Sequence, residues 1–315
     1  MTGTVAVTGA TGFVGQATVE HLLRSGWRVR VLIHRRGLET APTAMLETVH
    51  GGLDDSAALQ RLLDGVDAVV HVAGRVRGRR AGDFRPINAI GVERLARLAA
   101  ARSQSPRFIL ISSLAAREPG LSHYAASKRE GETRLARVAG ETSLRSAALR
   151  PPAVYGPGDR ELLPLFRTMA RGLAPVLGPA EARASLLHVN DLAIAVERLL
   201  DSELHDGTPG GYSWDDIAAT VAAGAGCRPG RRLPVPGALL RGLAGLNLAT
   251  AMLLRYQPML TPGKVNELRH PDWVCDNTAF TRVTGWRPAI TLRDGLQPLF
   301  GPGRPQTREG VSNVH

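Results

Sequence analysis

An apolar strand pattern near the N-terminus runs directly into a turn built on three glycines, and an apolar helix pattern follows the turn. The strand is expected over residues 4–8, the glycines stand at positions 9, 12 and 15, and the helix pattern continues through 17–23. Glycines at this spacing permit a tight turn, close approach of the backbone to a pyrophosphate, and close packing of helix on strand. The motif therefore predicts a dinucleotide site at the helix N-terminus. Its expected contacts are Gly9, Thr11, Gly12, Phe13, Val14 and Gly15.

The second strand pattern, at 29–33, ends in basic side chains. His34, Arg35 and Arg36 follow it, and no acid is present there. A site that reads the ribose 2′-hydroxyl of NAD places an acid at this point, whereas an Arg accommodates the 2′-phosphate of NADP. Residues 34–36 therefore favour NADP(H) as the cofactor. NAD(H), with a solvated basic loop at 34–36, is the alternative.

Strand and helix patterns go on alternating to about residue 157. Further strands are expected at 47–51, 67–74, 108–111 and 144–150, with helix patterns between them. Unbroken alternation predicts an α/β fold, a Rossmann-type doubly wound parallel sheet with right-handed crossovers. Ligands of such sheets bind outside the carboxyl ends of the strands.

Two segments at that predicted edge are suited to line the cofactor. Ala73 and Gly74 form a small strand end that would let the cofactor pass close to the backbone. The Pro- and Gly-rich loop at 151–158 is expected to be rigid and extended. It would wall a nicotinamide ring through Pro151, Ala153 and Val154.

Three side chains with acid–base chemistry follow the 108–111 strand. Tyr124 and Lys128 are four residues apart on an expected helix, so the ammonium can lie beside the phenol and lower its pKa. Ser113 would present its hydroxyl to the same substrate oxygen. The chain carries 39 basic residues, and only Lys128 and Lys264 among them are lysines. Lys128 is thus one of only two positions where the chain carries a compact ammonium instead of a guanidinium, and this choice favours a catalytic role for Lys128.

The pattern changes beyond residue 160, where helices and Gly- and Pro-bearing links replace the regular alternation. We expect a Rossmann domain at 1–157 plus 186–202, a smaller C-terminal substrate lobe at 158–185 and 203–300, and a flexible tail at 301–315. The apolar stretch at 239–254 is too short between its flanking arginines to span a bilayer, which needs about 20 residues. We expect it to pack in the core or the lobe rather than on a membrane surface.

Composition limits the partners and the location. The net charge of +11 comes from basic residues spread over the chain, without aromatic interleaving, so no nucleic-acid partner is expected. Cys227 and Cys275 match no ligand or redox spacing, and no metal site is expected. The first residues show no charged-then-apolar leader, which favours a cytoplasmic location.

With these residues in hand, the chain resembles the extended short-chain dehydrogenase/reductase superfamily, also called the NAD-dependent epimerase/dehydratase family. The matching motifs run in family order over nearly the whole chain: 8–15, 71–74, Asn88 with Gly91, Ser112-Ser113, 124–128, 149–157, 188–192 and 285–288. The resemblance implies that Tyr124 is the proton donor or acceptor, that Lys128 holds the nicotinamide ribose, and that Ser113 orients the substrate oxygen. It adds Val72, Asn88 and Ser112 as cofactor contacts. It also suggests a homodimer through helices at 88–102 and 122–139.

The chain departs from the family pattern in three places. Gly52 stands where many relatives carry an Asp that reads the adenine, so a neighbour such as Leu53 must supply that contact. The loop from Ser113 to Tyr124 is shorter than in typical nucleotide-sugar epimerases. Residues 114–116 are Leu-Ala-Ala where sugar dehydratases carry an Asp-Glu pair, so elimination of water lacks its acid and base.

Three functions remain open at this point. The first is an NADP(H)-linked dehydrogenase or reductase that acts on a secondary alcohol or ketone, similar to the 3β-hydroxysteroid dehydrogenase and dihydroflavonol reductase branches. The apolar stretch at 237–254 suits a lipophilic substrate for it. The second is a nucleotide-sugar epimerase that retains NAD. The third is a cofactor-binding subunit without turnover, which an intact Ser113, Tyr124 and Lys128 argues against.

Overall fold

The computed structural model describes residues 3–34, 37–38, 40–201, 212–227 and 230–300. The expected tail at 301–315 and the two arginines at 35 and 36 lie outside these ranges, as do residues 202–211 of the expected domain boundary.

A six-stranded sheet forms the centre of the molecule, and all its neighbouring strands are parallel. Its order is β3-β2-β1-β4-β5-β6. The first three strands are added towards one edge of the sheet and the next three towards the other, so the order of addition reverses between β1 and β4. This arrangement confirms the predicted doubly wound parallel sheet, and the reversal marks the place where such folds bind ligands. The strands are β1 (Thr4–Thr8), β2 (Arg28–Ile33), β3 (Leu46–His50), β4 (Ala68–His71), β5 (Arg107–Ile111) and β6 (Ser146–Leu149).

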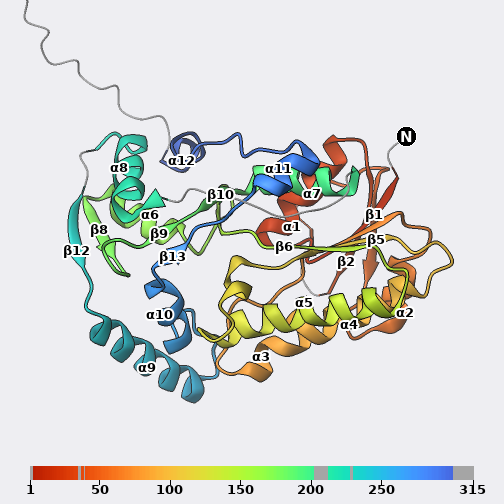
Figure 1. Cartoon of the computed structure of the whole chain (residues 1–315), viewed down its shortest axis with the longest axis horizontal. Coiled ribbons are helices and arrows are strands. Elements are labelled where there is room, and N and C mark those ends of the chain that lie inside the picture. The colour runs from red at the N-terminus through yellow and green to blue at the C-terminus, as the bar shows by residue number, and fades with distance from the viewer. Residues whose placement is uncertain (1–2, 35–36, 39, 202–211, 228–229, 301–315) are drawn as a thin grey trace, which may run out of the picture.

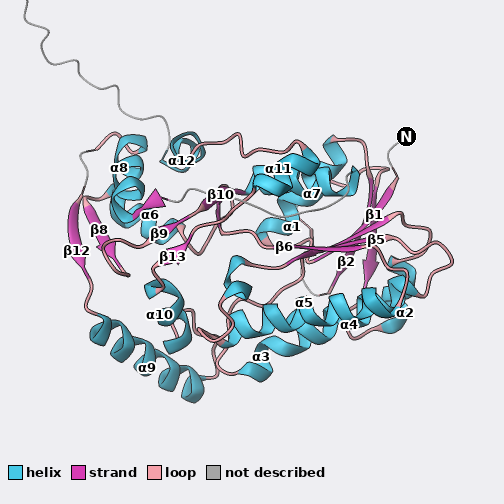
Figure 2. Cartoon of the chain, viewed as in Figure 1, coloured by secondary structure: helices cyan, strands magenta, loops and turns pink. Residues whose placement is uncertain are grey.

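Helices cover both faces of this sheet (Figures 1 and 2). Alternate strand residues feed two separate cores: Val5 and Val7 point to one face, whereas Ala6 points to the other. The first face carries α1 (Phe13–Arg24), α7 (Val189–Asp201) and α11 (Thr278–Thr284), and the second carries α2 (Ser56–Leu62), α4 (Val92–Ala100) and α5 (His123–Glu141). Because both faces are buried, the inner strands β1, β4 and β5 are mostly apolar.

The turn after β1 depends on glycine. Gly9 has a φ of 74°, and a Cβ built on it would lie 2.4 Å from the backbone nitrogen of Ala73. A Cβ on Gly15 would lie 2.0 Å from the carbonyl oxygen of Gly9. The glycines therefore let the turn, helix α1 and the end of β4 approach one another more closely than side chains would allow.

A smaller lobe adjoins the carboxyl edge of the sheet (Figure 1). One part has its own core around Phe166, Met169, Ile217 and Leu296. Its elements are α6 (Leu163–Ala170), β8 (Leu173–Val176), β9 (Arg183–Ala184), β11 (Tyr212–Ser213), α8 (Trp214–Gly224), β12 (Arg231–Pro234), β13 (Asp272–Trp273) and α12 (Leu292–Phe300). The other part is a helix pair, α9 (Gly237–Leu254) and α10 (Pro262–Arg269). Short elements connect the two units: α3 (Ala81–Arg85), the π-helix Pro86–Gly91, the 3₁₀ turn Leu114–Arg117, β7 (Ala153–Tyr155) and β10 (Leu186–His188).

One expectation about the C-terminal half is corrected. Phe280 and Trp286, which were expected in the substrate lobe, pack in the sheet core against α7. The apolar stretch at 239–254 forms α9, which packs against α10 in the lobe. Only Leu240, Ala244 and Ala251 are buried in it, and Leu248 is half-buried.

Candidate active site

Ser113 and Tyr124 meet at the carboxyl end of β5. The strand ends at Ile111, and the Ser113 hydroxyl accepts a hydrogen bond from the Ala115 backbone nitrogen at 3.2 Å. Tyr124 lies in the first turn of α5, which begins behind Ser122, whose hydroxyl accepts from the Ala125 nitrogen at 2.9 Å. The Ser113 hydroxyl lies close enough to the Tyr124 phenol to lower its pKa. Two neighbouring hydroxyls can both reach one substrate oxygen.

Lys128 lies one turn further along α5 and points to the sheet edge. Its Nζ donates to the carbonyl oxygen of Ile111 at 2.9 Å, and a Cβ on Gly74 would lie 3.1 Å from that Nζ. The side chain is buried, which lowers the pKa of Lys128 to about 8 although the carboxylate of Glu132 partly opposes the shift. The ammonium thus adjoins the end of β4, which itself contacts the glycine turn.

The structure corrects the expected effect of Lys128 on the phenol. Burial raises the pKa of Tyr124 above its ordinary value; the Ser113 hydrogen bond and the Lys264 ammonium lower it in part, and Glu267 raises it. The charges that act on Tyr124 therefore come from α10 in the lobe rather than from Lys128 on its own helix. Sequence reasoning missed Lys264 and Glu267 as site residues, although Lys264 is the second of the two lysines.

Helix α10 is joined to the start of α5 through Glu267. Lys264 Nζ lies 2.9 Å from Glu267 Oε2, and the Ser122 hydroxyl donates to the same carboxylate. The Glu267 side chain is 7% exposed and that of Lys264 is 39% exposed. One carboxylate therefore holds a lobe cation and the residue that caps the helix of Tyr124.

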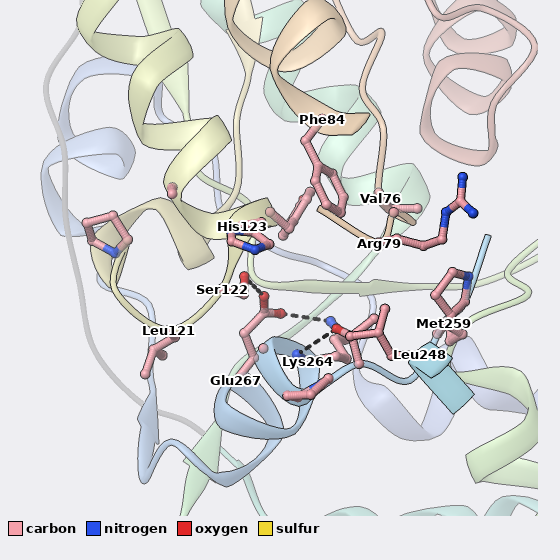
Figure 3. Close-up of a pocket in the computed structure, with 18 of the residues that line it drawn as sticks. Val76, Arg79, Phe84, Leu121, Ser122, His123, Leu248, Met259, Lys264 and Glu267 are labelled. Carbon is pink, nitrogen blue, oxygen red and sulfur yellow. Dashed lines mark hydrogen bonds and ion pairs between the residues drawn. The ribbon is translucent and has the colours of Figure 1, made fainter. Parts of the chain in front are cut away.

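A cavity of about 310 Å³ opens beside Tyr124, between the sheet edge and the lobe (Figure 3). Phe84 and Val76 line one side of it, and Leu248 and Lys264 line the other (Figure 3). The Phe84 ring lies 6.3 Å from the Tyr124 ring, centroid to centroid, in an edge contact. The phenol therefore stands at a largely apolar wall.

Asn88 and Ser112, two of the expected cofactor contacts, make hydrogen bonds within the protein. The Asn88 amide spans the loop after β4 and helix α5, because it accepts from the Arg75 nitrogen at 2.7 Å and donates to Ser127 Oγ at 2.9 Å. The Ser112 hydroxyl donates to Glu132, which binds the Arg150 guanidinium in a bidentate pair. These bonds position α5 against the sheet, and cofactor contact by either residue stays a prediction.

The first turn of α1 fits a pyrophosphate. Gly12 caps α1 without a side-chain hydrogen bond, and no acidic residue lies in the first turn. The exposed backbone N–H groups and the helix dipole favour an anion there. Thr11, Phe13 and Val14 are half-buried around that turn, and Gly15 is buried behind it.

The remaining expected contacts border the same edge of the sheet. Val72 and Ala73 are half-buried there, and Gly74 is exposed. His34 is exposed after β2, and the Leu53 carbonyl accepts from Arg94 at 2.7 Å. In the loop that begins at Pro151 and continues into β7, Pro151 is buried, Ala153 is exposed and Val154 is half-buried.

Comparison with known proteins is consistent with this arrangement. The family model described as "NAD dependent epimerase/dehydratase family" matches residues 5–212. A ceramide reductase of Caulobacter vibrioides is 41% identical over 286 residues, which cover 86% of each chain. A 2-alkyl-3-oxoalkanoate reductase of Stenotrophomonas maltophilia is 24% identical, over 94% of this chain and 98% of its own. A UDP-glucose 4-epimerase of Vibrio cholerae is 28% identical over 64% of this chain and 67% of its own.

Solved structures show the same fold. The protein MoeE5 in complex with UDP-glucose and NAD superposes with a TM-score of 0.71 at 24% identity, over 93% of this chain and 96% of its own. The UDP-glucose 4-epimerase of Thermotoga maritima superposes with a TM-score of 0.70 at 19% identity, over the same shares of the two chains.

Proposed function

The chain belongs to the NAD-dependent epimerase/dehydratase family, and from that membership we propose that it is an NADP(H)-linked reductase that converts the ketone of a long-chain, lipid-like substrate to a secondary alcohol. Use of an NAD(P) cofactor follows from the family. The observation that carries the finer proposal is the position of Tyr124, with Ser113 beside it, at the wall of a largely apolar cavity.

Tyr124 acts as the acid in this proposal. When bound, the nicotinamide supplies a hydride to the carbonyl carbon, and the oxygen then needs one proton. Because burial raises the pKa of Tyr124, the phenol keeps its proton at neutral pH and can donate it. The Ser113 hydroxyl lies near the phenol, so it can hold the same oxygen in line. A protonated phenol suits reduction better than oxidation, which needs a base.

Lys128 and the glycine turn would hold the cofactor. The turn offers backbone N–H groups to the pyrophosphate, and Gly74 leaves the Lys128 ammonium open to the sheet edge. Its pKa of about 8 keeps Lys128 mostly protonated at neutral pH, so it can donate hydrogen bonds to ribose hydroxyls. Preference for NADP(H) is supported by Arg35 and Arg36 after β2 and by the lack of an acid there.

The cavity favours a substrate with an apolar chain. Its walls include Val76, Phe84, Leu248 and Met259, and its Lys264 ammonium already has Glu267 as a partner. Two of the similar proteins are named for ceramide and for 2-alkyl-3-oxoalkanoates. We therefore propose a ketone on the chain of a long-chain lipid amide or acid as the group that is reduced.

A nucleotide-sugar epimerase is the second candidate, because proteins of that name are similar in sequence and fold. A nucleotide sugar brings a pyrophosphate into the substrate site, and such a group is usually bound by free cations. The two cations that line the cavity are otherwise engaged: Arg79 donates to the Ala251 carbonyl at 3.2 Å, and Lys264 pairs with Glu267. This engagement favours the reductase.

The test is substrate-dependent oxidation of NADPH, with 3-oxo long-chain amides and acids compared with UDP-glucose. Tyr124→Phe should lower turnover about 10²- to 10⁴-fold, because the proton donor is lost, and should leave NADPH binding intact. Tyr155→Phe is the matched control: its buried hydroxyl donates to the Thr291 carbonyl in the lobe core, so turnover should stay near that of the parent. Retained NAD with interconversion of UDP-sugars and no NADPH oxidation would establish the epimerase instead. NADPH binding without turnover of any substrate would favour the non-catalytic subunit.

A further inference from the structure

Helix α9 exposes an apolar face. The side chains of Leu239, Leu243, Leu246, Leu253 and Leu254, here called the α9 face, are 49 to 80% exposed. Large hydrophobic side chains scattered singly on a surface need no explanation, but five leucines on one helix form a contiguous patch. The helix has a mean hydropathy of 1.4, and only 17% of it is buried.

The exposed leucines share one side of the helix. Their spacing of four, seven, fourteen and fifteen residues from Leu239 places them on one face. The opposite face packs Leu240 and Ala244 against Val265 of α10. Thr250, which lies among the leucines, donates its hydroxyl to the Leu246 carbonyl at 2.9 Å. The α9 face therefore presents neither a charge nor an unsatisfied hydroxyl.

The charged residues within and next to α9 in the sequence are basic. The sequence holds no Asp or Glu from residue 217 to residue 266, whereas it holds five arginines and Lys264 there. Arg241 and Arg255 stand exposed within and directly after α9. An apolar helix face in a basic segment is complementary to a bilayer with anionic headgroups, which attract basic side chains while the apolar face enters the acyl boundary.

The helix is held against the protein, so it would lie along a membrane rather than cross it. Arg79 donates to the Ala251 carbonyl at 3.2 Å, and Asn247 donates to the Leu260 carbonyl at 2.7 Å. Its 18 residues span about 27 Å at 1.5 Å per residue, which is less than the roughly 30 Å of a hydrocarbon core.

The cavity beside Tyr124 shares this part of the lobe. Leu248 of α9 and Met259, which follows the helix, line the cavity, and Leu248 is half-buried. Figure 3 shows both side chains on the lobe side of the cavity. Docking at α9 would therefore bring the cavity close to the bilayer surface.

We propose that the α9 face docks into the surface of a bilayer that contains anionic phospholipid, and that the substrate enters the Tyr124 cavity from that membrane. The docking is inferred from the apolar face and from the basic residues of the same segment. The entry of substrate from the membrane depends in addition on the proposed function.

Co-sedimentation with vesicles tests the docking. The full-length protein should bind vesicles that contain both phosphatidylglycerol and phosphatidylcholine. Binding should be weaker to vesicles of phosphatidylcholine alone, and weaker to the mixed vesicles at high salt. The double variant Leu246→Glu with Leu253→Glu should lower the affinity for the mixed vesicles at least about tenfold, because it places two charges on the face that enters the bilayer. The control adds the same charge on the exposed face of α2, as Ala57→Glu with Gln60→Glu, and should lower affinity less than about threefold. Unchanged circular dichroism would show that both variants fold.

Three outcomes would overturn the docking. One is wild-type protein that binds neither vesicle, and another is an equal loss of affinity in the α2 control. The third is a stable dimer that Leu246→Glu with Leu253→Glu converts to monomer while the wild type ignores vesicles, because a second copy would then cover the α9 face. Vesicle binding needs no turnover, so binding without reduction of any 3-oxo lipid would leave the docking in place and reject the proposed function.

Discussion

Replacing Lys128 by Met should make the protein less stable relative to its parent as the pH rises, although it should stabilise the protein at neutral pH. The Lys128 pKa falls from 10.5 to about 8 on folding, because burial penalises the ammonium more than Glu132 favours it. A drop of about 2.5 units corresponds to about 3 kcal/mol at roughly 1.4 kcal/mol per unit. The free energy of unfolding of the parent carries this penalty in full below pH 8.

The sign follows from proton binding. Between pH 8 and 10.5 the unfolded chain holds the proton on Lys128 while the folded protein has released it, so the parent gains stability as the pH rises. From pH 7.5 to 9.5 the gain is about 2 kcal/mol. Lys128→Met lacks the titrating amine and gains none of it. Loss of the bond to the Ile111 carbonyl offsets part of the stabilisation at pH 7.5, by about 1 kcal/mol.

Urea unfolding at pH 7.5, 8.5 and 9.5, followed by circular dichroism, measures the difference between parent and variant. Lys264→Met is the matched control, because it removes the only other lysine. Burial alone would lower the Lys264 pKa, but its ion pair and hydrogen bond with Glu267 raise it above 10.5. Its contribution is therefore constant below pH 10.5, and this variant should follow the pH dependence of the parent. Equal slopes for the parent and Lys128→Met would refute the reasoning.

Two further predictions concern acid stability and cofactor choice. His71 is fully buried, and burial together with the Lys128 charge lowers its pKa from 6.5 to about 3. The free energy of unfolding should therefore fall by about 2 kcal/mol between pH 6.5 and 5, because the unfolded chain takes up a proton on His71 that the folded protein does not. His71→Asn, which keeps an amide for the Thr8 hydroxyl at the 2.8 Å contact, should remove that decline in urea titrations, and a decline equal to that of the parent would contradict the assignment. Replacing Arg35 and Arg36 by Ala should raise the dissociation constant of NADPH far more than that of NADH in fluorescence titrations; equal losses would leave NAD(H) as the cofactor.

The sheet and the convergence of Ser113 with Tyr124 were predictable, because both follow from short-range patterns. Alternating apolar strands and helices determine a parallel sheet, and a parallel sheet brings the ends of its strands to one edge. The boundaries were less predictable: the strand expected at 67–74 ends at His71, since the small residues after it leave the sheet to approach the glycine turn.

The lobe side of the site was not predictable in the same way. Lys264 and Glu267 reach Tyr124 only because α10, some 140 residues later in the chain, packs on the start of α5. No local pattern encodes that contact. The exposure of most of α9 was not predictable either, because hydropathy alone does not separate a buried helix from an exposed one.

The hydroxyl of Ser122 joins the helix of Tyr124 to the lobe. It caps the helix that carries the acid, and it also donates to the carboxylate that belongs to the substrate wall. A lobe that swings outward must break this bond, and the first turn of α5 then loses the restraint that orients the phenol. Any opening of the cavity at this contact would therefore also loosen the helix turn that carries the proton donor.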